Sequence, residues 1–287
     1  MRGIKKLLLC FLAVLTVLTV TVLGNGVVNA GTPLEQKQAQ PLTNEQLDRW
    51  DAPDRDYLEF YGLPVFTTTL PVIYINTQGQ QIGKENKIEC SIALGVDDGK
   101  PHSIEAMPQA LYRARINYRG ASSYSKFDKK QHRIKFLKDH SDKAQNVALC
   151  GMGKNSEWVL NGPYLDKTLV RNKLIYDLAR ETGQWAPDSR FCELFVDGEY
   201  HGVYLAIEPV TNGDSRLRLS KFGLVSGKTP YLVERNRDSL VDEALVTYGK
   251  EMGYTNLSMY IDYPSSSNLT ERQEHYIRED LSTFERV

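Results

Sequence analysis

The chain has 287 residues, of which 41% are hydrophobic and 25% are charged, and its formal net charge is -1. This is the composition of an ordinary globular protein with enough apolar side chains for a sizeable core. A net charge this close to zero excludes a protein held to nucleic acid or to an anionic membrane surface by overall positive charge, so any phosphate site must be local.

The first thirty residues have the three-part order of a secretion signal. A basic start is followed by the uncharged run from Leu7 to Leu23 and by small residues that end at Ala30. We therefore predict that residues 1–30 are a signal peptide cleaved after Ala30 and that the protein acts outside the cytoplasm. The alternative is an uncleaved membrane anchor, although the run is short against the roughly 20 residues that a spanning helix needs.

Residues 31–69 predict a polar linker or arm, because they are rich in Gln, Pro, Asp and Thr and lack apolar periodicity. A Tyr-Leu-Glu-Phe-Tyr stretch at 57–61 could dock on the main body, which begins near Leu70.

Apolar alternation predicts most of the strands of that body. Strands are expected at 71–76, 87–94, 111–119, 131–137 and 231–234. Within 131–137, His132, Ile134 and Phe136 share one face, and Arg133 and Lys135 share the other. Asp197-Gly198 separates two further runs, 191–196 and 199–207, and predicts a hairpin with a type I′ turn.

Two helices are predicted. Residues 167–182 carry an apolar stripe that includes Val170, Leu174 and Leu178, with Asp166 as the N-cap and Gly183 as the terminating residue. A second helix begins after a capping pattern at Asn268 or Thr270 and runs to the end of the chain. We predict an α+β fold over 70–287, with an antiparallel-rich sheet and packed helices, as a single domain or as one lobe of a larger, incomplete domain.

Three cysteines, Cys90, Cys150 and Cys192, remain outside the predicted signal. An odd number cannot all pair within one chain, and none has CxxC spacing. We predict three buried, inert thiols; one disulfide with one free thiol is the alternative.

The basic stretch from Arg113 to Lys138 is the first candidate site. Two strands with cations on one face are joined by a Gly-Ser turn, and charge-assisted bonds to phosphate are strong. The candidate phosphate contacts are Arg119, Ser122, Ser123, Lys130, Arg133 and Lys135. The alternative is that these cations are the solvated face of a half-buried hairpin.

Further candidates are Arg171 and Asn172 at a helix start, where exposed N–H groups favour anions, and Glu208 at the end of a strand. An ordinary capped surface helix and a strand exit to water are the alternatives. The sequence has no GxxxxGK[ST] loop, GxSxG elbow or HExxH pair, so an ordinary P-loop, a serine-hydrolase nucleophile and a zinc-protease site are not predicted.

Six segments, taken in order, resemble the CotH family of spore-coat protein kinases. The most specific are the Arg-Gly-x-Ser-Ser turn at 119–123, the Asp-Lys-Thr-x-x-Arg-Asn helix start at 166–172 and the Gly-x-Tyr-x-Gly-x-Tyr hairpin at 198–204. The other three are 70–75, 129–136 and 158–161.

The resemblance implies an atypical, secreted kinase-like protein that uses ATP and Mg²⁺ and phosphorylates Ser/Thr-rich proteins of a spore coat or cell surface. It implies that Lys135 or Lys130 acts like the strand lysine of kinases, with Glu208 as its ion-pair partner. No nucleic-acid partner is expected, and a membrane is expected only through an uncleaved N-terminal segment.

Two departures from the family pattern matter. The usual Asn of the Arg-Gly-Asn-Ser-Ser turn is Ala121, and the metal-holding aspartates of the family would lie beyond Val287. We therefore identify no metal ligand or catalytic residue and expect this chain to be inactive by itself. The rival hypotheses are a non-catalytic extracellular binding or adhesion module and a spore-coat scaffold on the same fold.

Overall fold

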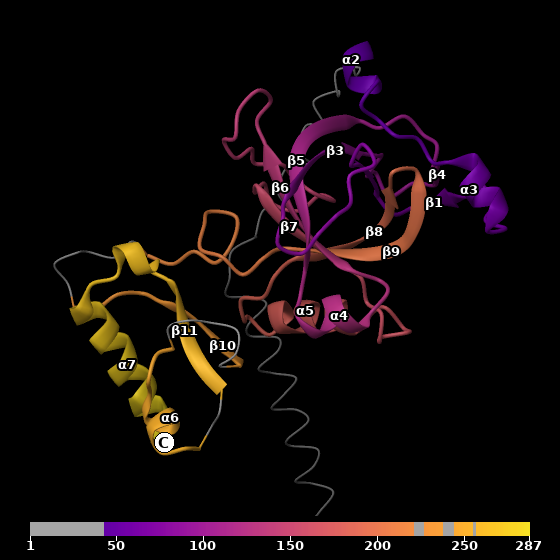
Figure 1. Cartoon of the computed structure of the whole chain (residues 1–287). Helices are drawn as coiled ribbons and strands as arrows, with labels where there is room; N and C mark the ends of the chain where they lie inside the picture. The colour runs from indigo at the N-terminus through magenta and orange to yellow at the C-terminus, as the bar shows by residue number, and fades with distance from the viewer. Residues whose placement is uncertain (1–42, 221–226, 238–243, 255–256) are drawn as a thin grey trace, which may run out of the picture. The chain divides into compact units, whose positions relative to one another are not determined.

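Seven strands form a closed barrel (Figure 1). The computed structural model describes residues 43–220, 227–237, 244–254 and 257–287. The strands follow one another around the barrel in the order β2-β3-β5-β6-β7-β9-β8. Their bounds are β2 (Val72–Asn76), β3 (Ile88–Leu94), β5 (Ala110–Arg119), β6 (Gln131–Leu137), β7 (Glu157–Asn161), β8 (Ser189–Val196) and β9 (Glu199–Ile207).

The barrel closes through a parallel pairing of β2 with β8, and its other neighbours are antiparallel. The prediction of mixed α/β structure rich in antiparallel strands is confirmed. The closure was not predicted, because nothing in the spacing of the strands indicates that the first one pairs with one more than a hundred residues later.

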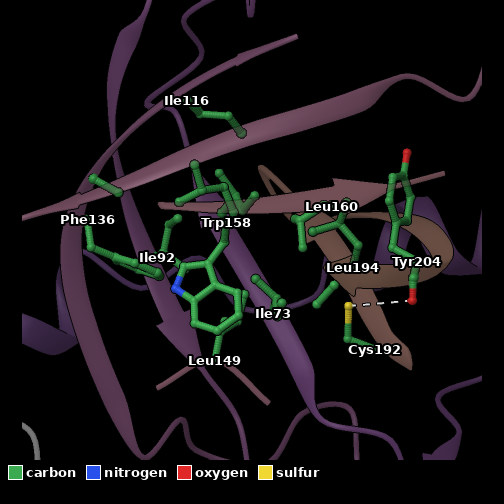
Figure 2. Close-up of a cluster of buried hydrophobic side chains, with 14 of the residues drawn as sticks. Ile73, Ile92, Ile116, Phe136, Leu149, Trp158, Leu160, Cys192, Leu194 and Tyr204 are labelled. Atoms are coloured by element: carbon green, nitrogen blue, oxygen red, sulfur yellow. Dashed lines mark hydrogen bonds between the residues drawn. The ribbon is translucent and has the colours of Figure 1, made fainter. Parts of the chain in front are cut away.

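The inward faces of the strands form the main core. On β6, His132, Ile134 and Phe136 are buried, as the alternation predicted. Trp158 of β7 fills the middle of the cluster and is fully buried (Figure 2). Burying one such apolar side chain contributes roughly 1.5–3 kcal/mol, so this cluster stabilises the barrel.

The β8–β9 hairpin turns at Asp197 and Gly198, whose φ angles are 49° and 82°. Positive φ at both central residues is what a type I′ turn requires, so the predicted turn is confirmed. The carboxylate of Asp197 accepts hydrogen bonds from the backbone N–H and the hydroxyl of Thr77, at 2.6 and 2.5 Å. The turn is thereby tied to the end of β2.

The second half of the predicted arm packs on the barrel. It contains α2 (Asn44–Leu47), α3 (Arg55–Phe60) and β1 (Thr67–Thr68), which pairs with β4 (His102–Ser103). Leu58 is 1% exposed and packs against Val72 and Phe195, so the aromatic stretch at 57–61 does dock on the body. The predicted signal at 1–30 lies outside the described residues.

Two helices follow barrel strands, α4 (Ser122–Lys126) after β5 and α5 (Arg171–Glu181) after β7. Helix α5 begins four residues later than predicted, because Leu169 takes a φ of 63° that breaks the first turn. Asp166 still organises this start: its carboxylate accepts from the N–H groups of Thr168 and Arg171, at 3.1 and 2.9 Å. The predicted apolar stripe is present, but it faces solvent.

The C-terminal part contains a two-stranded ribbon and a long helix. β10 (Leu232–Arg237) pairs with β11 (Leu257–Tyr263), and α6 (Tyr248–Glu251), a 3-10 turn (Ser266–Asn268) and α7 (Glu271–Glu285) complete it. Thr270 and Gln273 form the predicted capping box of α7. Within α7 Ile277 is buried, whereas Phe284 is 78% exposed.

All three cysteines of the described chain are free and buried. Burial raises the pKa of the Cys90 thiol to about 12, so it stays protonated at neutral pH. The prediction of three inert thiols is confirmed, and the alternative of one disulfide is wrong.

Candidate functional site

A hollow of about 580 Å³ opens beside the C-terminal ends of β5 and β7 and the N-terminal part of β6. Its polar lining includes three arginines, Arg119, Arg133 and Arg235, and three acids, Glu208, Glu234 and Asp262. Asn161, Tyr176 and Thr211 add an amide and two hydroxyls, and apolar residues of β7, β9 and β10 supply the remaining walls. This size and this mixture of apolar walls with a few polar groups are typical of a small-ligand site.

Strand register brings two cations together in this hollow. β5 and β6 pair so that Asn117 lies opposite Arg133 and Arg119 lies opposite Gln131. Arg119 and Arg133 are therefore diagonal neighbours on the outer face of the barrel. The surrounding protein lowers the pKa of Arg119, chiefly by removing water and secondly through the charge of Arg133, while Tyr176 and Glu234 partly oppose the shift. An anion placed between them would relieve this repulsion.

The other cations of the two strands are neutralised on the outside of the barrel. Arg113 donates two hydrogen bonds to Glu89, at 2.6 and 3.1 Å, and Arg115 donates to Asp142 at 2.8 Å. Lys135 lies 3.2 Å from Glu157. For these residues the solvated-face alternative describes what the structure shows.

Glu208 has a different partner from the lysine that we expected. Its Oε1 accepts from Arg216 at 2.6 Å, and its Oε2 accepts from the N–H of Asp188 at 3.0 Å. Lys130 instead donates to the carbonyl of Tyr124 at 2.6 Å. The expectation that Glu208 pairs with Lys135 or Lys130 is wrong, because both lysines are held by closer acceptors.

The Glu208–Arg216 pair is buried, with side-chain exposures of 8% and 0%. The guanidinium of Arg216 lies 4.4 Å from the centroid of the Trp158 ring and also donates to the carbonyls of Ser215 and Glu157. This network fixes the carboxylate of Glu208 at the edge of the hollow. Sequence reasoning missed Arg216, because it lies in a polar loop without periodicity.

The Gly-Ser turn and the start of α5 do not line the hollow. Ser122 and Ser123 open the five-residue helix α4. Gly120 precedes them with a φ of 99°, and a Cβ there would lie 2.1 Å from the hydroxyl oxygen of Ser123. Arg171 and Asn172 are exposed on α5, where Arg171 lies 3.6 Å from Asp166. Tyr176 is the residue of α5 that lines the hollow, and sequence reasoning did not single it out.

The described residues contain no group of three or more His, Cys, Asp or Glu side chains arranged to hold a metal ion. Within the same part of the chain, no helix combines the length and the apolar character needed to cross a membrane.

Two comparisons show which known proteins this chain resembles. The family model described as CotH kinase protein matches residues 116–286, a range that includes the C-terminal end of β5, every residue that lines the hollow, and α7. The chain is also similar to the inner spore coat protein H of Bacillus subtilis (strain 168), with 30% identity over 138 residues. That match covers 48% of this chain and 34% of the relative, so it spans about a third of the relative's length. The chain belongs to the CotH kinase protein family.

Proposed function

We propose that this chain binds the phosphate groups of ATP in the hollow between Arg119 and Arg133, as the nucleotide-binding part of a kinase-like CotH protein. The observation that carries the proposal is the pair of like charges held side by side in a concave site while the neighbouring cations are neutralised. Guanidinium groups bind phosphate oxygens in a bidentate manner, and each such charge-assisted bond is strong.

The apolar and aromatic walls of the hollow suit the rest of a nucleotide. Val159 and Ile207 offer an apolar surface, and Tyr176 and Asn161 offer hydrogen-bonding groups at its edge. The bound nucleotide would supply the γ-phosphoryl group for transfer to Ser or Thr of a coat or cell-surface protein. Residues of this chain would bind and orient the phosphates, which is the larger part of what phosphoryl transfer asks of a protein.

The described residues contain no group of three or more acidic, His or Cys side chains arranged around one point where Mg²⁺ could bind. Glu208, the carboxylate best fixed at the hollow, is already held by Arg216 and by a backbone N–H. We therefore assign no metal ligand and derive no catalytic step through the metal. The spore-coat location of the relative, together with the predicted secretion signal, leads us to propose that this protein also acts in a spore coat or at a cell surface.

ATP binding to the purified chain, measured by calorimetry, tests the proposal. Each hydrogen bond to a charged group contributes roughly 1.5–3 kcal/mol, which is about ten- to a hundredfold in affinity. Replacing Arg119 and Arg133 together with Ala should therefore weaken binding by at least about a hundredfold. The matched control is Arg113→Ala, which removes a cation from the same strand that pairs with Glu89 outside the hollow. Binding unchanged in the double variant would refute the site, and no binding to the unaltered chain would refute the proposal.

The second candidate function is a non-catalytic binding module or coat scaffold. The exposed apolar face of α5 favours it, because large exposed apolar patches mark interaction surfaces. The two functions are separable, since this face does not line the hollow.

A further inference from the structure

Helix α5 is docked on the barrel with its apolar side outward. Its Leu174, Ile175 and Leu178 are 60%, 60% and 51% exposed, and no residue of the helix is buried. The side that meets the barrel carries Tyr176, which packs against the apolar cluster of Val159, Leu205 and Ile207. In an amphipathic helix of a globular protein the apolar stripe normally faces the core, so this helix leaves its most apolar surface without a partner within the described chain.

The outward face of α5 has an opposite charge at each end. With 3.6 residues per turn, Arg171 lies about one turn before Leu174 on this face, and Glu181 lies about one turn after Leu178. The side chain of Arg171 is 76% exposed, and Glu181 is exposed. Arg171 is only loosely paired, since its nearest carboxylate, Asp166, is 3.6 Å away.

These positions are symmetric about Tyr176. Leu174 and Leu178 are each two residues from it, and Arg171 and Glu181 are each five residues from it. If two copies of the helix run antiparallel and are related by a two-fold axis at the level of Tyr176, Leu174 meets the partner's Leu178. The same axis brings Arg171 to the partner's Glu181, and each of these contacts occurs twice. A two-fold interface requires such self-complementarity of a single surface.

We infer that the outward face of α5 binds a second copy of this chain, as an antiparallel helix pair with apolar contacts at its centre and an Arg171–Glu181 ion pair at each end. The complementary charges at the two ends of one apolar face favour a copy of the same chain over a lipid surface, which would match only the cationic end. This inference does not rest on the proposed nucleotide site, because neither Arg171 nor the apolar residues of the face line the hollow.

Charge exchange tests the inference. The dimer dissociation constant of the purified chain is measured by sedimentation equilibrium at low salt. Arg171→Glu places like charges at both ends of the interface and should weaken dimerisation by at least about tenfold. The double variant R171E/E181R recreates both ion pairs with their signs reversed and should return the dissociation constant to within about threefold of the original value.

A Leu178→Arg variant tests the apolar centre and should yield monomers at concentrations where the unaltered chain is dimeric. Circular dichroism of each variant checks the fold, and these exposed side chains should leave it unchanged. A monomeric unaltered chain at about 100 μM would overturn the inference, because even a weak dimer should form there. Dimerisation that Arg171→Glu leaves unchanged, or that the double variant does not restore, would also overturn it.

Discussion

His132 should make the barrel sensitive to mild acid. Its ring is 1% exposed and faces the core between the rings of Tyr118 and Tyr204, and its Nδ1 has no hydrogen-bond partner. Burial lowers its pKa from 6.5 to about 3, and the charge of His201 adds to this effect. The folded protein therefore keeps His132 neutral under conditions in which the unfolded chain protonates it.

The sign and the size of the effect follow from proton linkage. Between pH 6.5 and pH 3 the unfolded state binds a proton that the folded state does not, so stability falls as pH falls through this window. With these pKa values His132 alone should lower the free energy of unfolding by about 2 kcal/mol between about pH 8 and about pH 5.

Urea denaturation at the two pH values measures this loss. His132→Leu removes the titrating ring without stranding a polar group, so its loss of stability between about pH 8 and about pH 5 should be smaller by about 2 kcal/mol. Comparison of the two proteins at the same pH cancels the contributions of other groups, including His201, whose pKa is also lowered. His275→Gln, which removes an exposed histidine of α7, is the matched control. An equal loss in the His132 variant and in the unaltered chain would refute the reasoning.

Two further predictions concern the residues that support the site. Glu208→Ala leaves the buried guanidinium of Arg216 without its carboxylate and should lower the free energy of unfolding by roughly 3–5 kcal/mol; a loss below about 1 kcal/mol in urea denaturation would show that water replaces the carboxylate. Gly120→Ala places a Cβ on a residue with a φ of 99° and against the hydroxyl of Ser123. It should therefore lower the free energy of unfolding by about 1 kcal/mol or more. Gly213→Ala, at a position with open space and no positive φ, should change the free energy of unfolding by no more than about 0.5 kcal/mol. Equal losses of stability in the two variants would contradict the backbone strain expected at Gly120.

Local features of this fold could be predicted from the sequence because they depend on neighbouring residues. The alternation around Ile134 predicted which face of β6 is buried, and Asp197-Gly198 predicted a tight hairpin turn. The Thr270–Gln273 capping box was predicted for the same reason. Barrel closure depends on the parallel pairing of β2 with β8, a non-local contact that no periodicity records.

Helix α5 shows what a correct periodicity leaves open. The spacing of Leu174 and Leu178 does describe an apolar face, but periodicity indicates only that a helix has such a face and not what covers it. The contact with the barrel is made instead by Tyr176, whose ring packs on an apolar cluster beside the hollow. An apolar stripe that would normally be assigned to the core is exposed here, and it therefore favours association with a second copy of the chain.

The candidate site shows that a sequence pattern also leaves open which charged side chains are paired in the folded protein. Arg113, Arg119, Arg133 and Lys135 look equivalent along the sequence, since each lies on the polar side of an alternating strand. What separates them is which acids from distant segments reach them: Glu89, Asp142 and Glu157 neutralise Arg113, Arg115 and Lys135. Arg119 ends β5 and Arg133 lies near the start of β6, where the register leaves them beside each other and the hollow begins. Their shared electrostatic repulsion, rather than the number of cations in the segment, is the property that makes this part of the barrel suited to bind an anion.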